Sequence, residues 1–228
     1  MTTPALVELP AEGIWRIGRA PDPFAWRHPD PVHTGEAGSG NRFDSFHGNF
    51  GVVYFATNPE ACYAETLARF RPLTRLGDLV RTEWRNAGWM EPGSVAADWR
   101  DSRILIRARI VDALPFVDIT HSDTLLAVRE DIRVASWLES FGVGDVDLAT
   151  VIGHDRRVTR LIAQWAAEHL DDDRPSYSGI RYMSRLGAQY ECWAVFEGSS
   201  IEELERRPVL KSDADLTCVA ERYRLTVH

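Results

Sequence analysis

The chain has little of what several protein classes require. Its three cysteines, Cys62, Cys192 and Cys218, form no CxxC pair and leave one thiol over, which argues against a disulfide framework and a cysteine-rich zinc site. The seven histidines show no HExxH or HxH spacing, so we expect no metal site. No apolar run approaches the roughly 18 residues of a membrane span, and no basic start followed by an apolar run opens the sequence. We therefore expect a cytoplasmic protein that does not enter the membrane.

Positive charge is also in short supply. Lysine and arginine number 26 against 34 aspartates and glutamates, which gives a net charge of −8, and nucleic-acid-binding domains usually concentrate basic residues instead. We expect no direct binding of nucleic acid. A GxxxxGK[ST] phosphate loop and a GxSxG nucleophile elbow are both absent, and Gly35, Gly38 and Gly40 lack the spacing of a dinucleotide-binding turn after a strand.

What is present is the composition of an ordinary folded protein. The 228 residues are 44% hydrophobic and 26% charged, which fits one domain with extensions. Periodicity and turn residues predict strands over 14–18, 52–56, 103–111, 179–184, 191–196 and 216–227. They predict helices over 59–70, 73–86, 122–141 and 154–170, with irregular chain over 20–41 and 91–102. Helices grouped among strands that do not alternate with them favour an α+β fold.

Two charged patterns are typical of solvated surface. Arg103, Arg107 and Arg109 share one face of the strand predicted over 103–111, and the expected environment of that face is solvent. The run 171–173 consists of three aspartates and ends a predicted helix, where a solvated turn is more usual than a metal cluster.

The most informative stretch is 41–72, which combines a cation, a phenol and a carboxylate. Arg42 lies in a predicted loop, Tyr54 interrupts the apolar strand over 52–56, and Glu65 lies at the border of the apolar face of the next helix. Asn58 and the proline after it supply an N-cap and a first helical residue. This combination indicates a site.

These residues carry a resemblance to a known family. The chain resembles the RES-domain toxins of RES–Xre toxin–antitoxin pairs, whose fold is related to the ADP-ribosyltransferases of the diphtheria-toxin type. The matching segments are Gly40-Asn41-Arg42-Phe43, Val53-Tyr54-Phe55-Ala56, Ala61-Cys62-Tyr63-Ala64-Glu65 and Trp15-Arg16-Ile17, with Ser184 of 180–185 as the family serine. Two departures lie beside Arg42, where Asn41 replaces a glycine and 44–45 replaces an Asn-Pro pair.

The resemblance implies a single ADP-ribosyltransferase-like domain over 1–228. Its α+β core would span about 14–197, with a mixed, mainly antiparallel sheet and flanking helices. Residues 198–228 would form a C-terminal extension that packs on this core.

The resemblance also implies that NAD⁺ is cleaved at its nicotinamide–ribose bond, as a substrate rather than a cofactor. Glu65 would stabilise positive charge on the ribose, and Tyr54 would stack on the cationic nicotinamide ring. Arg16 and Arg42 would bind phosphate oxygens, and Ser184 would bind substrate or hold an arginine. Glu65, Arg42 and Tyr54 form the expected catalytic set.

The acceptor stays open on the residues alone. Water would make the protein an NAD⁺ glycohydrolase, inorganic phosphate a phosphorylase, and a protein side chain an ADP-ribosyltransferase; we place water or phosphate ahead. The family also implies an Xre-type antitoxin as partner, and a homodimer of toxins held by antitoxins would fit it. Two other classes stay open: a non-catalytic interaction module, and a hydrolase of unrelated α+β fold with Glu65 on its surface.

Overall fold

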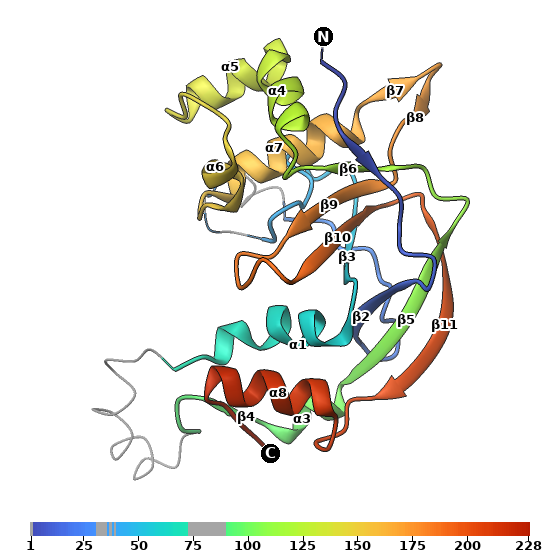
Figure 1. The fold of residues 1–228 in the computed structure, drawn as a ribbon, viewed down its shortest axis with the longest axis vertical. Helices are drawn as coiled ribbons and strands as arrows, with labels where there is room; N and C mark the ends of the chain where they lie inside the picture. Colours follow the sequence, from blue (N-terminus) through green and yellow to red (C-terminus); the bar gives the residue numbers. More distant parts are fainter. Residues whose placement is uncertain (1, 31–35, 37, 39, 73–89) are drawn as a thin grey trace.

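One eight-stranded sheet runs through the molecule and connects two groups of helices (Figure 1). The structure, a computed structural model, describes residues 2–30, 36, 38, 40–72 and 90–228. The helix predicted over 73–86 lies outside these residues. The strands of the sheet, in spatial order, are β1 (Leu6–Val7), β6 (Phe116–Asp118), β9 (Gly179–Met183), β10 (Glu191–Phe196), β3 (Val52–Ala56), β2 (Ile14–Arg19), β5 (Arg103–Val111) and β11 (Ser200–Pro208).

All neighbouring strands of this sheet are antiparallel except β6 and β9, which are parallel. The predicted α+β fold with a mixed, mainly antiparallel sheet is therefore confirmed. Two short strand pairs lie outside it, namely β4 (Ser94–Val95) with β12 (Thr226–Val227) and β7 (Leu170–Asp171) with β8 (Arg174–Pro175).

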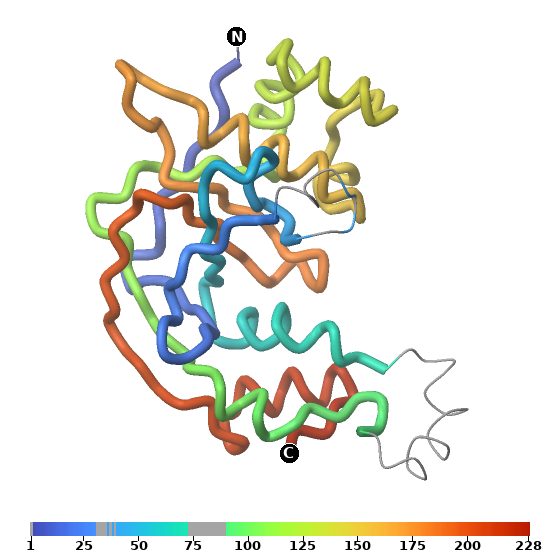
Figure 2. The backbone as a smooth tube through the Cα atoms, turned by 180° about the vertical axis from the view of Figure 1, so that it is seen from behind, coloured from blue at the N-terminus to red at the C-terminus, as the bar shows by residue number. Residues whose placement is uncertain are grey.

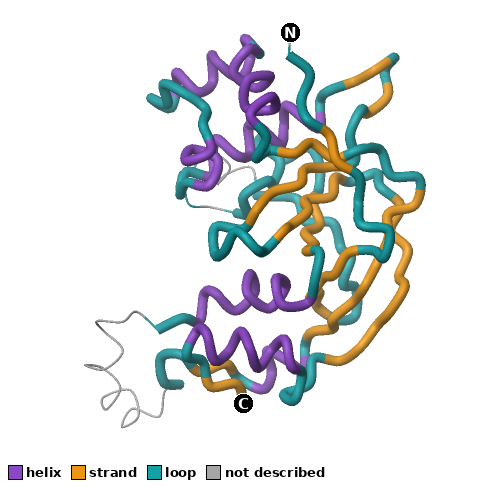
Figure 3. Tube along the Cα trace, in the orientation of Figure 1, coloured by secondary structure: helices purple, strands orange, loops and turns teal. Residues whose placement is uncertain are grey.

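The helices gather at the two ends of the sheet (Figures 1 and 3). One group contains α1 (Pro59–Leu67), its 3-10 extension η2 (Ala68–Phe70), α3 (Ala97–Asp101) and α8 (Ala214–Tyr223). The other contains α4 (Ser122–Glu130), α5 (Ile132–Ser140), α6 (Leu148–Ile152) and α7 (Arg156–Ala167). The view from behind shows β5 and β11 as long neighbouring strands at the sheet edge, with the chain termini at opposite ends of the molecule (Figure 2). None of the described helices combines the length and apolarity needed to cross a bilayer.

Strand β3 lies in the middle of the sheet and pairs to different extents with its two neighbours. It pairs with β10 along all five of its residues, whereas its pairing with β2 is limited to Trp15 opposite Ala56. Beyond that pair the two strands separate, and the guanidinium of Arg16 occupies the opening. Its Nε donates to the carbonyl of Pro23 at 2.6 Å and its Nη1 donates to the carbonyl of Tyr54 at 2.8 Å. The gap between β2 and β3 thus places a half-buried cation within the sheet.

The helix predicted over 122–141 is two helices, because Asp131 interrupts it. The backbone of Asp131 is extended (φ −77°, ψ 115°), and its side chain accepts from the backbone N–H of Arg133, which caps α5. Aspartate competes in this way with helix continuation. The single-helix prediction missed this break. A short helix, α3, also forms inside the segment expected to be irregular.

The strand predicted over 216–227 is wrong. Asp213 caps α8, whose buried residues Leu216, Val219, Ala220 and Tyr223 follow helical spacing. Arg224, in the left-handed region at φ 56°, ends this helix, and only β12 remains extended. The strand was predicted because the segment contains β-forming residues, but its apolar positions also fit a helix.

Residues 198–228 supply β11 and α8, where we expected an extension packed on the core. β11 pairs with β5 at the sheet edge, and α8 packs against α1. Facing β11, Arg109 lies 2.6 Å from Glu202 and Arg107 lies 3.3 Å from Glu205. Arg109 is exposed as predicted, whereas Arg103 is half-buried and lines a cavity. The aspartates at 172 and 173 form the exposed turn between β7 and β8, as predicted.

Candidate active site

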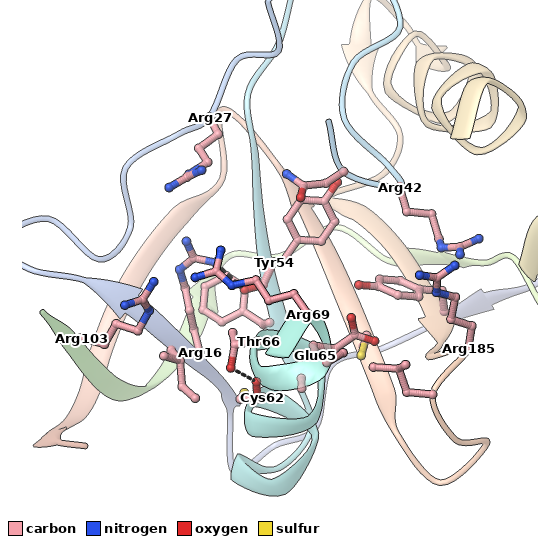
Figure 4. A pocket seen from close by; sticks show the side chains of 18 of the residues that line it. Arg16, Arg27, Arg42, Tyr54, Cys62, Glu65, Thr66, Arg69, Arg103 and Arg185 are labelled. Carbon is pink, nitrogen blue, oxygen red and sulfur yellow. Dashed lines mark hydrogen bonds between the residues drawn. The ribbon is translucent and has the colours of Figure 1, made fainter. Parts of the chain in front are cut away.

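A cavity of about 550 Å³ opens beside β2, β3, β9 and α1, and it contains most of the predicted site residues (Figure 4). Arg16, Arg42, Tyr54 and Glu65 all line it. Ser184 reaches it through a hydrogen bond to Glu65. A cavity of this volume suits a small-molecule ligand. The fold therefore brings together five side chains that are up to 168 positions apart along the chain, from Arg16 to Ser184.

Glu65 owes its position to the helix that carries it. The side chain of Asn58 caps α1 by accepting from the N–H of Ala61 at 2.9 Å, and Ala64 and Leu67 bury the other face of the helix. Glu65 is left exposed at the cavity, where its Oε1 accepts a hydrogen bond from the hydroxyl of Ser184. Its second oxygen, Oε2, has no hydrogen-bond partner among the described residues.

Ser184 is fixed on both sides of this contact. Only 5% of the residue is exposed, its N–H donates to the carbonyl of Tyr190 at 2.8 Å, and its Oγ accepts from the N–H of Leu186 at 3.0 Å. Because the Oγ already accepts from Leu186, its own proton is directed to Glu65. Ser184 therefore orients the carboxylate of Glu65.

Tyr54 presents its ring to the cavity and its hydroxyl to the protein. The hydroxyl donates to Oδ1 of Asp44 at 2.8 Å and accepts from the N–H of Phe43 at 3.0 Å. Burial is the main reason that the pKa of Tyr54 lies well above its usual range, and Asp44 adds to it. A phenol that stays neutral and makes two hydrogen bonds within the protein is unsuited to acid–base chemistry. The ring of Tyr54 is therefore the part of the side chain that can contact a ligand.

Asn41 and Asp44, the two positions beside Arg42 that differ from the family pattern, are hydrogen-bonded to each other in a turn. Asp44 is 3% exposed, and its carboxylate accepts from the N–H of Asn41 at 2.7 Å and from the Asn41 amide at 3.2 and 3.3 Å. Gly40 precedes this turn at φ +59°, and a Cβ there would approach Oδ2 of Asp44 and Nη2 of the buried Arg160 to 3.0 Å each. Asp44 thus anchors both Tyr54 and the segment that carries Arg42.

Arg42 reaches from this turn to the end of α6. Its two terminal nitrogens donate to the carbonyls of Val151 and Ile152, the second at 3.2 Å. The last carbonyls of a helix lack partners within the helix, which favours a cation there. Burial first, and then the neighbouring charge of Arg185, lower the pKa of Arg42. The side chain is therefore held at the cavity wall.

Arginine dominates the lining of the cavity. Nine arginines line it, and Glu65 is the one carboxylate among the lining residues that the structure describes. The nine are Arg16, Arg19, Arg27, Arg42, Arg69, Arg71, Arg103, Arg156 and Arg185. Sequence reasoning missed most of them because they come from separate segments with no shared spacing. A cavity lined in this way is suited to a polyanionic ligand.

Two cysteines also line the cavity, and both are buried. Burial raises the pKa of Cys62 to about 12, and its thiol donates to the carbonyl of Trp15 at 3.1 Å. Burial likewise raises the pKa of Cys192. Because the thiolate is the reactive form, neither cysteine is suited to act as a nucleophile. Within the described ranges, no three histidine, cysteine or acidic side chains are grouped for a metal ion.

No curated protein matches the sequence. A solved chain from the crystal structure of the M. tuberculosis MbcT–MbcA toxin–antitoxin complex is similar at 14% identity and a TM-score of 0.47, over 94% of this chain and 90% of that chain. The RES domain family matches residues 14–218, which is most of the sequence. The chain therefore belongs to the RES domain family.

Proposed function

We propose that this protein degrades NAD⁺ by cleaving the nicotinamide–ribose bond, and that it acts as the toxin of a toxin–antitoxin pair in the cytoplasm. The observation that carries this proposal is one carboxylate, Glu65, oriented by Ser184 at a cavity otherwise rich in arginine. Such a cavity pairs a site for positive charge with several sites for phosphate. NAD⁺ offers both, since its ribose becomes cationic in the reaction and its pyrophosphate is anionic.

The chemistry needs only one carboxylate. Glycosidases use a second carboxyl group to protonate a leaving oxygen, whereas nicotinamide leaves NAD⁺ as a neutral base that needs no proton. The bond between the nicotinamide nitrogen and the ribose carbon breaks, its electron pair goes to the nitrogen, and positive charge spreads over the ribose. Glu65 stabilises that charge. Its Oε1 is bonded to Ser184, and its Oε2 is available for a ribose hydroxyl or the incoming nucleophile.

The neighbouring side chains bind the two other parts of the substrate. The ring of Tyr54 stacks against the cationic nicotinamide, an arrangement favoured by the aromatic quadrupole. Arg16 uses Nε and Nη1 for backbone carbonyls, which leaves Nη2 for a phosphate oxygen. Arg42 has both terminal nitrogens on α6, so it contributes charge more than direct donors.

The acceptor and the partner belong to the same proposal. Water as the acceptor gives ADP-ribose and phosphate gives its 1-phosphate ester, and we place both ahead of transfer to a protein side chain. The family resemblance points to an Xre-type antitoxin that covers the cavity. An acidic segment would complement the arginines of this cavity.

The test is nicotinamide release from NAD⁺ by the purified protein, followed by chromatography with and without phosphate. Glu65→Gln should lower kcat on the order of 100-fold or more, the usual effect of losing one preorganised electrostatic group. Glu221→Gln is the matched control, because Glu221 is an exposed glutamate of α8 outside the cavity lining. Equal turnover by both variants, with folding verified by circular dichroism, would remove the role of Glu65. The products then identify the acceptor.

A further inference from the structure

Four arginines gather at the end of the cavity away from Arg42 and Arg185. They are Arg19 of β2, Arg27 of the following loop, Arg69 of η2 and Arg103 of β5. We refer to them as the arginine cluster. Figure 4 shows Arg27, Arg69 and Arg103 beside Arg16, with Tyr54 between them and the pair Arg42 and Arg185.

The members of the arginine cluster have no carboxylate partner among the described residues. Arg181, by contrast, lies 3.2 Å from Asp118 and 2.8 Å from Glu191. The side chain of Arg69 lies over the ring of Phe70, and Arg103 lies over the ring of Trp99. Arg69 and Arg103 are therefore held by aromatic rings, Arg103 also by the carbonyl of Trp99, and no carboxylate in the described part of the chain pairs with any of the four.

The electrostatics show that the cluster is close enough for its charges to act on one another. Burial first, and then the charges of Arg19, Arg69 and Arg27, lower the pKa of Arg103 to about 10. Like charges that face one another in a partly enclosed cavity destabilise the empty site, and an anion between them removes that repulsion.

The number of cations exceeds what a pyrophosphate needs. The two phosphates of NAD⁺ carry one negative charge each, and Arg16, Arg42 and Arg185 already line the cavity beside Glu65 and Tyr54. A second anionic group would match the remaining cations. Arginine forks suit phosphate, whose oxygens accept bidentate hydrogen bonds.

We propose that the arginine cluster is a subsite for a phosphate dianion distinct from the pyrophosphate. This inference rests on the proposed function for the identity of the main substrate. The dianion has two sources of the same chemistry: the 2′-phosphate of NADP⁺, or inorganic phosphate bound beside NAD⁺. The first makes the subsite a determinant of nucleotide specificity, and the second makes it a co-substrate site.

Binding without turnover tests the subsite separately from catalysis. In the Glu65→Gln protein, calorimetry should show adenosine 2′,5′-bisphosphate binding at least 10-fold more tightly than AMP, or inorganic phosphate binding at submillimolar concentration. Arg27→Gln and Arg69→Gln should each weaken the preferred probe about 10-fold. Arg109→Gln, an exposed arginine of β5 that pairs with Glu202, should leave the binding unchanged.

The kinetic arms distinguish the two sources. With NADP⁺ as the source, Arg27→Gln and Arg69→Gln raise the KM for NADP⁺ about 10-fold and leave the KM for NAD⁺ unchanged. With inorganic phosphate as the source, the same variants abolish the stimulation of NAD⁺ turnover by phosphate. If both probes bind equally to wild type, Arg27→Gln and Arg69→Gln, the subsite is refuted even where NAD⁺ is cleaved. If no nucleotide is cleaved but the probes bind as stated, the proposed function fails and the subsite stands.

Discussion

Asp44→Asn should destabilise the fold, because one buried carboxylate holds together the turn before β3 and the hydroxyl of Tyr54. Asp44 accepts from the N–H of Asn41 at 2.7 Å and from the hydroxyl of Tyr54 at 2.8 Å. Its charge also acts on Arg160, which is fully buried. An asparagine keeps the shape of the side chain and removes the charge.

The magnitude follows from the donors around the carboxylate. An amide has one accepting oxygen and one donating nitrogen, so at least one donor that now faces a carboxylate oxygen would face an N–H. The loss of a hydrogen bond to a buried charged group costs about 1.5–3 kcal/mol, and Arg160 loses the stabilising charge of Asp44. We expect the free energy of unfolding to fall by about 2–4 kcal/mol, which corresponds to a Tm lower by about 4–16 °C for a chain of this length.

Urea unfolding followed by circular dichroism measures this change, with Asp172→Asn as the matched control. Asp172 lies in the exposed β7–β8 turn at φ 48°, a conformation that asparagine adopts readily. The control should stay within about 0.5 kcal/mol of wild type. If Asp44→Asn also stays within that range, Asp44 does not anchor the turn, and the argument from its hydrogen bonds is refuted.

Four further predictions concern particular side chains and one glycine. Tyr54→Phe keeps the ring but loses the hydroxyl, so NAD⁺ turnover should stay within a few-fold of wild type while the free energy of unfolding falls by about 1–3 kcal/mol. Tyr54→Leu should lower turnover at least 10-fold, and turnover equal to that of wild type would exclude stacking. Iodoacetamide at pH 8 should add one group to the folded protein, at the exposed Cys218, and three groups in urea, as mass spectrometry would show. Because the pKa of Cys62 is raised to about 12, the unfolded chain loses this proton first as pH rises above 9; stability should fall between pH 9 and 12, and less so in Cys62→Ala. Gly18→Ala would place a Cβ 2.4 Å from Cβ of Pro23, displacing the carbonyl that holds Arg16, so binding of NAD⁺ should weaken in calorimetry; unchanged affinity would contradict this.

Local patterns predicted the centre of the sheet and its first helix. The strands over 52–56, 103–111 and 191–196 have the predicted bounds, because each is a run of β-forming residues with a clear boundary. Asn58 caps α1 as its sequence position indicates. The same reasoning gave the wrong element for 216–227, because its β-forming apolar residues fit a strand as well as a helix, and the structure has α8 there, packed on α1.

The residues of the candidate site also differ in whether the sequence could predict them. Arg42, Tyr54 and Glu65 could be predicted because they occupy one continuous stretch around a recognisable strand and helix. The roles of Asp44 and of the arginine cluster could not, since they depend on contacts between distant segments. The net charge of −8 also gave no indication of this cavity, because an overall balance says nothing about where charges gather.

The two ends of the cavity are connected through one short element. Glu65 and Arg69 are four residues apart, which places neighbouring side chains one helical turn from each other. Glu65 lies on α1 and Arg69 on η2, which continues α1 directly, and α1 is held by the Asn58 cap and by α8. In the proposed reaction, the carboxylate that faces the ribose and a cation that faces phosphate would therefore be carried by one continuous helical segment. A change that shifts α1 would move both groups together, so it should weaken substrate binding and catalysis in parallel, whereas changes at Arg27 or Ser184 should separate the two effects.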